Sequence, residues 1–555
     1  MKKLLVIAAI AIQFIADAMP KKELNRNHHS FSGNSIKLRE ILPEWKEEEV
    51  VTIPEFINAG GIKFFIRKLG GRLLAPNDGV KQVIIPQSVK VIKEDSFREC
   101  LSLWKVIFAG ISNLKRIDSG AFFNTGLKLI HIPAKVKILG EYCFGQCKCL
   151  QEVTFIEDSN LKQINKGAFT YSDLESISIP AMVESIGEDC FSWSKNLHWV
   201  IFTEDSDLKR IDKKAFMCSG IKSIRIPPYV EFIDDYCFNE CKDLQEIVFG
   251  ANLKRIGMMA FCKVGLKSIS IPSKVRVIDE DCFRECKNLC EVIFAGNSNL
   301  KRIEKRAFEF SGLQSIRIPA KIEFIGGGCF GGCQSLRKVM FPEDCKLREI
   351  RYGTFEGSGL ELISIPAKVE KIDMHCFNGC KSLGEVVFPK DSTLKQIERR
   401  AFINSGLKSI HIPSGVESIG ENCFSGCKSL GEVIFEEDSN LKQIGEEVFF
   451  NSGLQSIRIP AKVESIGENC FGECKSLGEV TFEEDSNLKR IDRKAFMCSG
   501  LKSISVPPHV EFIGDCCFNE CKDLQEIVFG ANLKRIGKMA FFNSGLQSIH
   551  IPSGV

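Results

Sequence analysis

The dipeptide Ile-Pro, replaced once by Val-Pro, recurs along this chain at an almost constant interval. A period this regular indicates one small supersecondary unit stacked on itself many times. It constrains the fold more than any other feature, and it turns the functional question into what a long, regular surface can bind. The interval is 47 residues, shortened twice to 45, between Pro86, Pro133, Pro180, Pro227, Pro272, Pro319, Pro366, Pro413, Pro460, Pro507 and Pro552.

The repeat at 407–453 shows what lies between two of these prolines. It consists of two similar segments, which open with Leu-x-x-Ile-x-Ile at 407–412 and Leu-x-x-Val-x-Phe at 430–435. Such a short alternation predicts a β-strand with one buried face. Pro413 cannot donate to a ladder, so the first strand is expected to stop there.

One segment of this length cannot bury its own apolar side, but stacked segments can. Phenylalanine supports such stacking: twenty lie in a Phe-x-x-Cys/Ser column from Phe97 to Phe541. Ten more close the second strand of each repeat, from Phe108 to Phe529, and together they are 30 of the 42 in the chain. A phenylalanine that recurs at the same position of every repeat predicts a buried column of rings along the stack, which we call the buried spine. The alternative is an exposed aromatic surface.

Composition narrows the class of protein. Hydrophobic residues make up 44% of the 555 residues, which is ample for a core. Lys plus Arg number 74 and Asp plus Glu number 71, giving a net charge of +3. A nucleic-acid binder usually carries a strong basic excess, so this balance argues against nucleic acid as a partner.

The run at 412–427, Ile-Pro-Ser-Gly-Val-Glu-Ser-Ile-Gly-Glu-Asn-Cys-Phe-Ser-Gly-Cys, resembles the BspA-like subclass of leucine-rich repeats. The resemblance covers 80–555 and implies a solenoid of about twenty turns of 22–25 residues, built from short parallel strands, turns and short helical segments. Residues 19–79 match poorly, and we expect them to form an N-terminal cap or degenerate repeats. The last turn is interrupted at Val555, so the solenoid is expected to be truncated there.

The first eighteen residues are typical of an export signal. A basic start, Met1-Lys2-Lys3, precedes an apolar stretch at 4–15 and the small-x-small site at 16–18. We expect cleavage after residue 18. An uncleaved membrane anchor is the alternative, although the apolar stretch is shorter than the ~20 residues of a membrane span. No later segment is apolar enough to span a membrane.

Twenty-five cysteines raise the question of disulfides or metal. Sixteen form Cys-Phe-x-x-Cys pairs, but the neighbouring turns read Ala-Phe-x-x-Ser, so cysteine alternates with alanine at one site and serine at the other. We therefore predict small buried thiols, with a bond inside one turn as the alternative, and no metal. The cysteines outside this pattern are the expected reactive thiols: Cys149, Cys218, Cys262, Cys290, Cys345, Cys498 and Cys516.

Nothing in the sequence predicts catalysis. Catalysis needs unlike residues that converge on one spot, whereas the candidates here repeat evenly along the chain. The sequence contains no Gly-x-Ser-x-Gly elbow, phosphate loop or His-Glu-x-x-His. The acidic triplets at 436–438 and 483–485 are interpreted as solvated turns. We predict no enzyme activity, no cofactor and no metal.

The outward face of the strands is the predicted binding surface. Residues flanking the central Ile or Val point away from the core, because strand side chains alternate. Stacking predicts one stripe of Ser and Glu and another of Arg, His or Ser alternating with Val, Ile or Thr. Ordinary sheet surface is the alternative interpretation. The candidates on the concave face are His131, Arg225, Arg317, His411, Arg458, His550, Glu385, Glu432, Glu479, Trp104 and Trp199.

The resemblance implies adhesion, because BspA-like proteins act as surface adhesins that bind matrix proteins such as fibronectin or other microbes. We therefore expect a secreted or cell-surface protein that binds an extracellular matrix or surface protein through many weak, repeated contacts. The alternative is a secreted recognition or effector module with one soluble partner. An enzyme with its activity in 19–79 is a third reading. Oligomeric state is not predicted.

Overall fold

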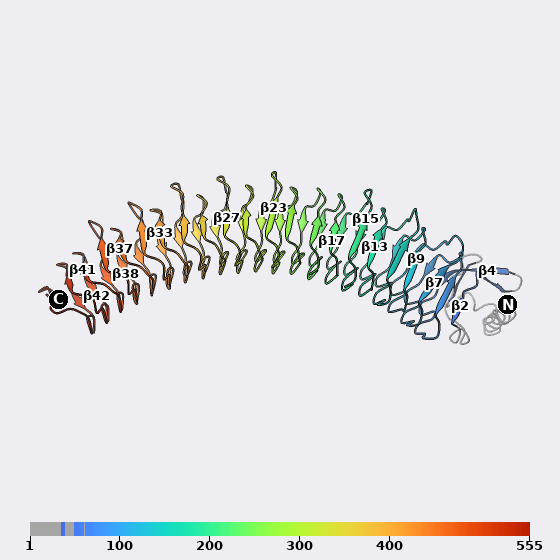
Figure 1. The fold of residues 1–555 in the computed structure, drawn as a ribbon, viewed down its shortest axis with the longest axis horizontal. Coiled ribbons are helices and arrows are strands. Elements are labelled where there is room, and N and C mark those ends of the chain that lie inside the picture. Colours follow the sequence, from blue (N-terminus) through green and yellow to red (C-terminus); the bar gives the residue numbers. More distant parts are fainter. Residues whose placement is uncertain (1–34, 39–48, 60–61) are drawn as a thin grey trace, which may run out of the picture. The chain divides into compact units, whose positions relative to one another are not determined.

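The computed structural model describes residues 35–38, 49–59 and 62–555. The chain divides into two compact units, Met1–Leu266 and Lys267–Val555, and each is a stack of short coils (Figure 1). Over the described ranges the structure consists of strands and turns without a helix, and so it has no helix that could span a membrane. The expected export signal at 1–18 lies outside these ranges.

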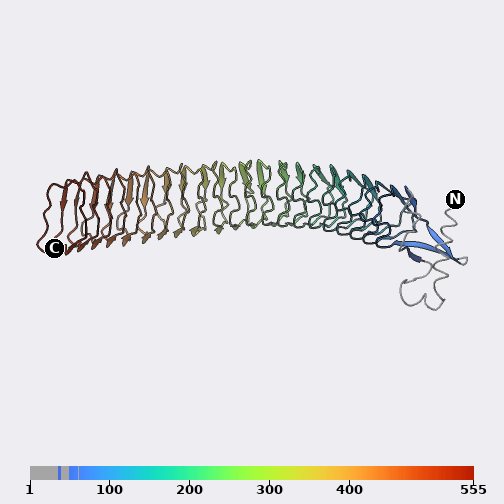
Figure 2. The ribbon, with the colours of Figure 1, turned by 90° about the horizontal axis from the view of Figure 1, so that it is seen from below.

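In the first unit, strands of three or four residues line one side of the stack, and mostly two-residue strands line the opposite side (Figure 2). The long strands are β2 (Val50–Thr52), β5 (Gln82–Ile85), β7 (Lys105–Phe108), β9 (Leu129–Ile132), β11 (Glu152–Phe155), β13 (Ser176–Ile179), β15 (Trp199–Phe202), β17 (Ser223–Arg225) and β19 (Glu246–Val248). The opposite sheet contains β1 (Ser35–Leu38), β3 (Phe56–Ala59), β4 (Ile62–Leu69), β6 (Val91–Ile92), β8 (Arg116–Ile117), β10 (Ile138–Leu139), β12 (Gln163–Ile164), β14 (Ser185–Ile186), β16 (Arg210–Ile211), β18 (Phe232–Ile233) and β20 (Arg255–Ile256).

The second unit has the same two kinds of strand. Its long strands are β21 (Ser268–Ile271), β23 (Glu291–Phe294), β25 (Ser315–Arg317), β27 (Lys338–Met340), β29 (Leu362–Ser364), β31 (Glu385–Val387), β33 (Ser409–Ile412), β35 (Glu432–Phe435), β37 (Ser456–Ile459), β39 (Glu479–Phe482), β41 (Ser503–Ser505) and β43 (Glu526–Val528). Its short strands are β22 (Val277–Ile278), β24 (Arg302–Ile303), β26 (Phe324–Ile325), β28 (Glu349–Ile350), β30 (Lys371–Ile372), β32 (Gln396–Ile397), β34 (Ser418–Ile419), β36 (Gln443–Ile444), β38 (Ser465–Ile466), β40 (Arg490–Ile491), β42 (Phe512–Ile513) and β44 (Arg535–Ile536).

The coil that starts at β33 shows why the chain bends where it does. β33 ends at Ile412, and the following turn closes when the Val416 amide donates to the Pro413 carbonyl at 3.1 Å. The chain then forms β34 and turns again before β35, which pairs in parallel with β33. Each coil thus adds one strand to each sheet, as the repeat predicts.

A third side of each coil, between the short strand and the next long strand, is made of turns. In the coil at 421–426 the amides of Asn422, Phe424 and Gly426 donate to carbonyls of the following coil at 2.8–3.0 Å. Asn422 and Gly426 have φ of 57° and 70°, in the left-handed region. The expected short helical segments are therefore wrong for the described part of the chain, because these amides bond between coils instead of to the carbonyl four residues back.

The phenylalanine column forms the interior. In the first unit the rings from Phe97 to Phe261 stack with centroids 5.0–5.5 Å apart and planes within 11°. In the second unit, Phe283 to Phe541 stack at 4.9–5.7 Å. Apart from half-buried Phe541 these rings are 0% exposed, which confirms the buried spine. The second-strand phenylalanines, Phe108 to Phe529, are only half-buried, since they close strands at the rim of the core.

The described part of 19–79 also contributes to both sheets. β2 pairs in parallel with β5, and β4 pairs in parallel with β6. β4 further pairs with β1 in parallel and with β3 in antiparallel orientation. The described part of 19–79 therefore extends both sheets, with strands that are less regular than those of the repeats.

Candidate functional site

The exposed side of the long strands forms the candidate binding surface, which we call the long-strand face. Parallel pairing holds residues of equal phase in one row: Ser409 lies beside Glu432, and His411 beside Ile434. Two coils later Ser456 lies beside Glu479 and Arg458 beside Thr481. The register thus forms a stripe of Ser and Glu next to a stripe in which His, Arg or Ser alternates with Val, Ile or Thr.

Most predicted candidates lie on this face. Because the central Ile or Val of each strand is buried, its two neighbours are turned outward. The exposed candidates within strands are His131 in β9, Trp199 in β15, Arg225 in β17, Arg317 in β25, Glu385 in β31, His411 in β33, Glu432 in β35, Arg458 in β37 and Glu479 in β39.

Two candidates need correction. Trp104 was expected on the strand face, but it is half-buried and lies one residue before β7, next to the buried Leu103. Trp104 directly follows Leu103, the first Leu of the motif, and the outward-facing position of the strand is the next residue along the chain. His550 is exposed, but the structure forms no strand at 547–551, so the histidine lies outside the register of the face.

The face brings some candidates together with their neighbours in adjacent coils. The ring of His131 shares a hydrogen bond with the Thr154 hydroxyl across the β9–β11 pair. Trp199 is 47% exposed and pairs with Ser176 on one side and Ser223 on the other. The predicted residues themselves lie in separate coils, so the face is a distributed surface and not a converging site.

The structure has a pocket of about 590 Å³ on the turn side and a second of about 490 Å³ at Arg317, and only the smaller one lies on the long-strand face. Its walls include Ile293, Arg317, Met340 and the loop at 295–298. Here β23 and β25 belong to separate sheets. Arg317 is thus the predicted candidate with a concave surrounding.

The paired cysteines are buried, as predicted. The Cys427 thiol donates to the Phe402 carbonyl at 3.0 Å, and the Ser405 hydroxyl lies 3.3 Å from the same sulfur. Ser194 replaces the cysteine in another coil and donates to the Phe169 carbonyl at 3.0 Å. Burial raises the pKa of the Cys427 thiol to about 11, so it stays neutral.

The cysteines outside the pairs differ in exposure. Cys149 and Cys290 are exposed, while Cys262 and Cys345 are buried. Cys218, Cys498 and Cys516 are half-buried. Burial raises the pKa of Cys218 and Cys498, which opposes the thiolate that reactivity requires.

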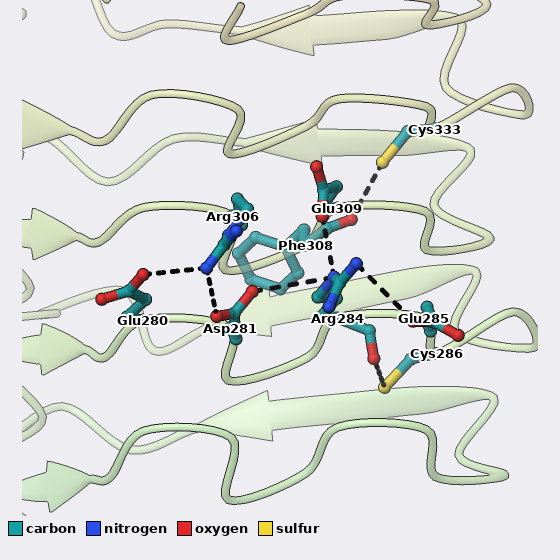
Figure 3. Close-up of polar contacts among 9 residues, drawn as sticks. All are labelled: Glu280, Asp281, Arg284, Glu285, Cys286, Arg306, Phe308, Glu309 and Cys333. Atoms are coloured by element: carbon teal, nitrogen blue, oxygen red, sulfur yellow. Dashed lines mark hydrogen bonds and ion pairs between the residues drawn. The ribbon is translucent and has the colours of Figure 1, made fainter.

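The sequence did not indicate a buried ionic cluster in the second unit (Figure 3). Asp281 is 2% exposed, and its carboxylate lies 2.9 Å from the Arg306 guanidinium of the next coil. Arg284 joins the same carboxylate at 3.7 Å and Glu309 at 2.8 Å. Burial raises the pKa of Asp281 and the nearby Arg306 opposes that rise. The contacts tie two successive coils together, which is a structural role.

The larger pocket, also missed from sequence, is a groove of about 590 Å³ on the turn side of the first unit. We call it the aromatic groove. Phe123, Tyr142, Tyr171 and Trp193 line it, and the rings of Tyr171 and Trp193 stack with centroids 5.7 Å apart. Tyr and Trp number only five and four in the chain, so their recurrence in successive turns was the available signal.

Comparison with known proteins identifies the repeat. The family model described as BspA type leucine rich repeat region matches residues 76–198, 209–337, 301–431, 348–463 and 442–555. No curated protein matches the chain significantly.

Solved structures of repeat proteins align with most of the chain. A leucine-rich repeat protein from Bacteroides ovatus is 22% identical, with 90% of this chain and 92% of that chain covered and a TM-score of 0.42. A leucine rich cell surface protein from Faecalibacterium prausnitzii is 21% identical, with coverage of 74% and 96% and a TM-score of 0.37. Since the family model matches most of the chain, the protein belongs to the BspA-type leucine-rich repeat family.

Proposed function

We propose that this protein is a non-catalytic binding solenoid, exported or held at the cell surface, which adheres to host matrix or to other cells through its long-strand face. The observation that carries the proposal is the register. It repeats outward-facing Ser or Glu at one position of the strand and His or Arg two residues later in alternate coils, so one face offers many similar contacts. Weak contacts of this kind add up against a repetitive partner.

Two further assignments belong to this proposal. Residues 1–18 direct export, and residues 19–79 cap the first coil. The cell-surface relative from Faecalibacterium prausnitzii supports a location outside the cell.

The alternative is a secreted effector that binds one soluble protein. The pocket at Arg317 favours it, because this hollow interrupts the regular face at one place. A single well-packed anchor can carry most of the affinity of an interface.

Substitution at one phase of the face tests the proposal. Arg225→Ser, Arg317→Ser and Arg458→Ser use the residue that other coils carry at this phase, as at Ser178. The readout is binding of the purified protein to immobilised fibronectin and to other matrix proteins. Adhesion through a repetitive surface predicts that each substitution weakens binding modestly and that the three add up.

The matched control is Lys462→Ser, in the exposed turn after β37 and outside the stripes. Complete loss of binding from Arg317→Ser alone would favour the single-partner effector. Unchanged matrix binding in the triple variant would contradict a role of the long-strand face.

A further inference from the structure

The aromatic groove lies on the turn side of the coil, away from the long-strand face, and the proposed adhesion does not use it. Its aromatic residues occupy backbone positions that do not favour them. Tyr142, Tyr171 and Trp193 have φ of 52°, 55° and 61°. Bulky residues rarely adopt the left-handed region. Tyr171 and Trp193 remain 42% and 37% exposed, so burial does not compensate for this conformation.

The fold does not require these rings. Equivalent coils occur 280 residues later, and there the same positions carry Asn422, Asn451 and Glu473. Their φ values are 57°, 55° and 60°, so the backbone is the same. The aromatic side chains in the first unit therefore need an explanation other than folding.

The geometry leaves ring surface available in the groove. Tyr142 lies over Gly167 of the next coil, where an added Cβ would come within 2.3 Å of its ring. One face of the ring is thus supported by backbone, and the ring also lines the groove. Tyr171 and Trp193 extend this surface across the next two coils.

The charges that line the groove are mostly negative. Glu94, Asp95, Glu141 and Asp189 contribute carboxylates, and Arg98 contributes the one cation among the lining residues. Nearby Lys166 pairs with Glu188 at 3.0 Å. Lys214 lies near Asp189, and Lys195 lies over Trp193. Among the residues that line the groove, carboxylates remain in excess.

The chain already holds two cations over rings of the groove, and Lys195 Nζ is one of them, 5.9 Å from the centroid of the Trp193 ring. The Arg98 guanidinium lies over the Phe123 ring, 4.4 Å from its centroid. It pairs with Asp95 at 3.3 Å and Glu99 at 3.2 Å. A guanidinium stacked on a ring and flanked by carboxylates is a favourable arrangement, because the π face and the anions both attract it.

We propose that the aromatic groove binds an arginine-bearing segment of a partner protein, with guanidinium groups stacked on Tyr142, Tyr171 and Trp193 and paired with Glu141 and Asp189. The volume of about 590 Å³ is within the usual range for a binding pocket. The excess of carboxylates distinguishes this ligand from a neutral one.

The test is a titration of the full chain with a fluorescein-labelled peptide of alternating arginine and glycine, followed by fluorescence anisotropy. The comparison peptide carries citrulline, which has nearly the shape of arginine without its charge. We expect the arginine peptide to bind at least about tenfold more tightly. Equal affinity for the two peptides would overturn the proposal.

The double variant Tyr171→Asn and Trp193→Asn removes the stacked pair while keeping a residue found at this phase in Asn124 and Asn451. It should fold like the wild type, which circular dichroism checks, and lose about tenfold in affinity for the arginine peptide. Tyr171→Phe should keep the affinity. Trp199→Ser, on the long-strand face, is the matched control and should also keep it.

Undiminished arginine binding in the double variant would overturn the proposal. A second contradicting result would be that the wild type binds maltohexaose, that the double variant does not, and that the arginine peptide does not compete for this binding. The groove would then hold a neutral sugar. Failure of the Arg225, Arg317 and Arg458 variants to affect matrix binding concerns the long-strand face alone, so the two proposals are tested separately.

Discussion

The coils at 142–196 in the first unit and at 422–476 in the second have the same interior and different exteriors. Phe144, Phe169 and Phe191 stack at 5.5 Å in the former. The corresponding rings at 424, 449 and 471 stack at 5.6 and 5.4 Å. Outside, the aromatic groove of the first region has polar counterparts in the second. The interior therefore determines the coil, while the residues at the left-handed turn positions vary between the regions.

The largest expected effect tests the shared interior. Phe144→Ala and Phe424→Ala each remove a ring that is 0% exposed, and each should lower the free energy of unfolding by about 3–5 kcal/mol. Urea denaturation followed by circular dichroism measures the loss. The half-buried Phe435 is the control, and its replacement by Ala should cost clearly less. A small loss at only one of the two buried positions would show that the interiors differ.

Alkaline pH should weaken both regions, because burial raises the pKa of Cys147 and of Cys427 to about 11, from an ordinary value of 9.0. The folded chain disfavours thiolates, so this contribution to stability is complete below pH 9 and falls as the pH rises through 11. Denaturation midpoints measured from pH 8 to pH 11 should decline.

Replacing both thiols supplies the control for the alkaline experiment. The variant Cys147→Ser and Cys427→Ser removes two of the titrating groups, so its midpoint should decline less steeply than that of the wild type. The same decline in both proteins would mean that other groups cause the alkaline sensitivity.

Gly167 in the first region allows a test of how the outer side chains of the two regions differ. Gly167 has φ of +59°, and an added Cβ would lie 2.3 Å from Tyr142 Cε1. The counterpart of Gly167 is Glu447 and that of Tyr142 is Asn422, so the second region has no ring at this place. Gly167→Ala should therefore cost about 1–3 kcal/mol of unfolding free energy, and less in a Tyr142→Asn background. Equal losses in both backgrounds would rule out the ring as the cause.

The cysteine that bonds to the preceding coil should tolerate serine better than alanine. Cys427→Ser keeps a donor for the Phe402 carbonyl, as Ser194 does for Phe169. Cys427→Ala leaves that buried carbonyl without this donor and should cost about 1–2 kcal/mol. Thermal melts of the two variants measure the difference. A greater loss for serine would contradict the hydrogen-bonding role.

Much of the fold follows from the sequence, because each coil repeats the same requirement. The Leu-x-x-Ile-x-Ile pattern places Ile410 inside and His411 outside, as the structure has them. The expectation of short helical segments failed because residues such as Asn422 take left-handed φ and their amides bond across coils. Whether these amides bond within the segment or to the next coil depends on that coil. The sequence pattern of a single segment carries no information about it.

The sites were less predictable than the fold. The outward candidates in the strands, such as Arg458, follow from alternation, but Trp104 was assigned to the strand one residue early. The aromatic groove depends on Tyr142, Tyr171 and Trp193, which lie in separate turns and meet only when the coils stack. No spacing within a single repeat brings them together.

The exchange of exterior residues between the two regions tests the account most directly. The variant with Tyr142→Asn, Tyr171→Asn and Trp193→Glu gives the first region the residues that the second region carries at these left-handed positions. Its melting temperature is measured beside that of the wild type. The account predicts no change beyond what surface substitutions of about 0.5 kcal/mol produce. A fall of the size produced by Phe144→Ala would contradict it, because the exterior residues would then be part of what holds the coils together.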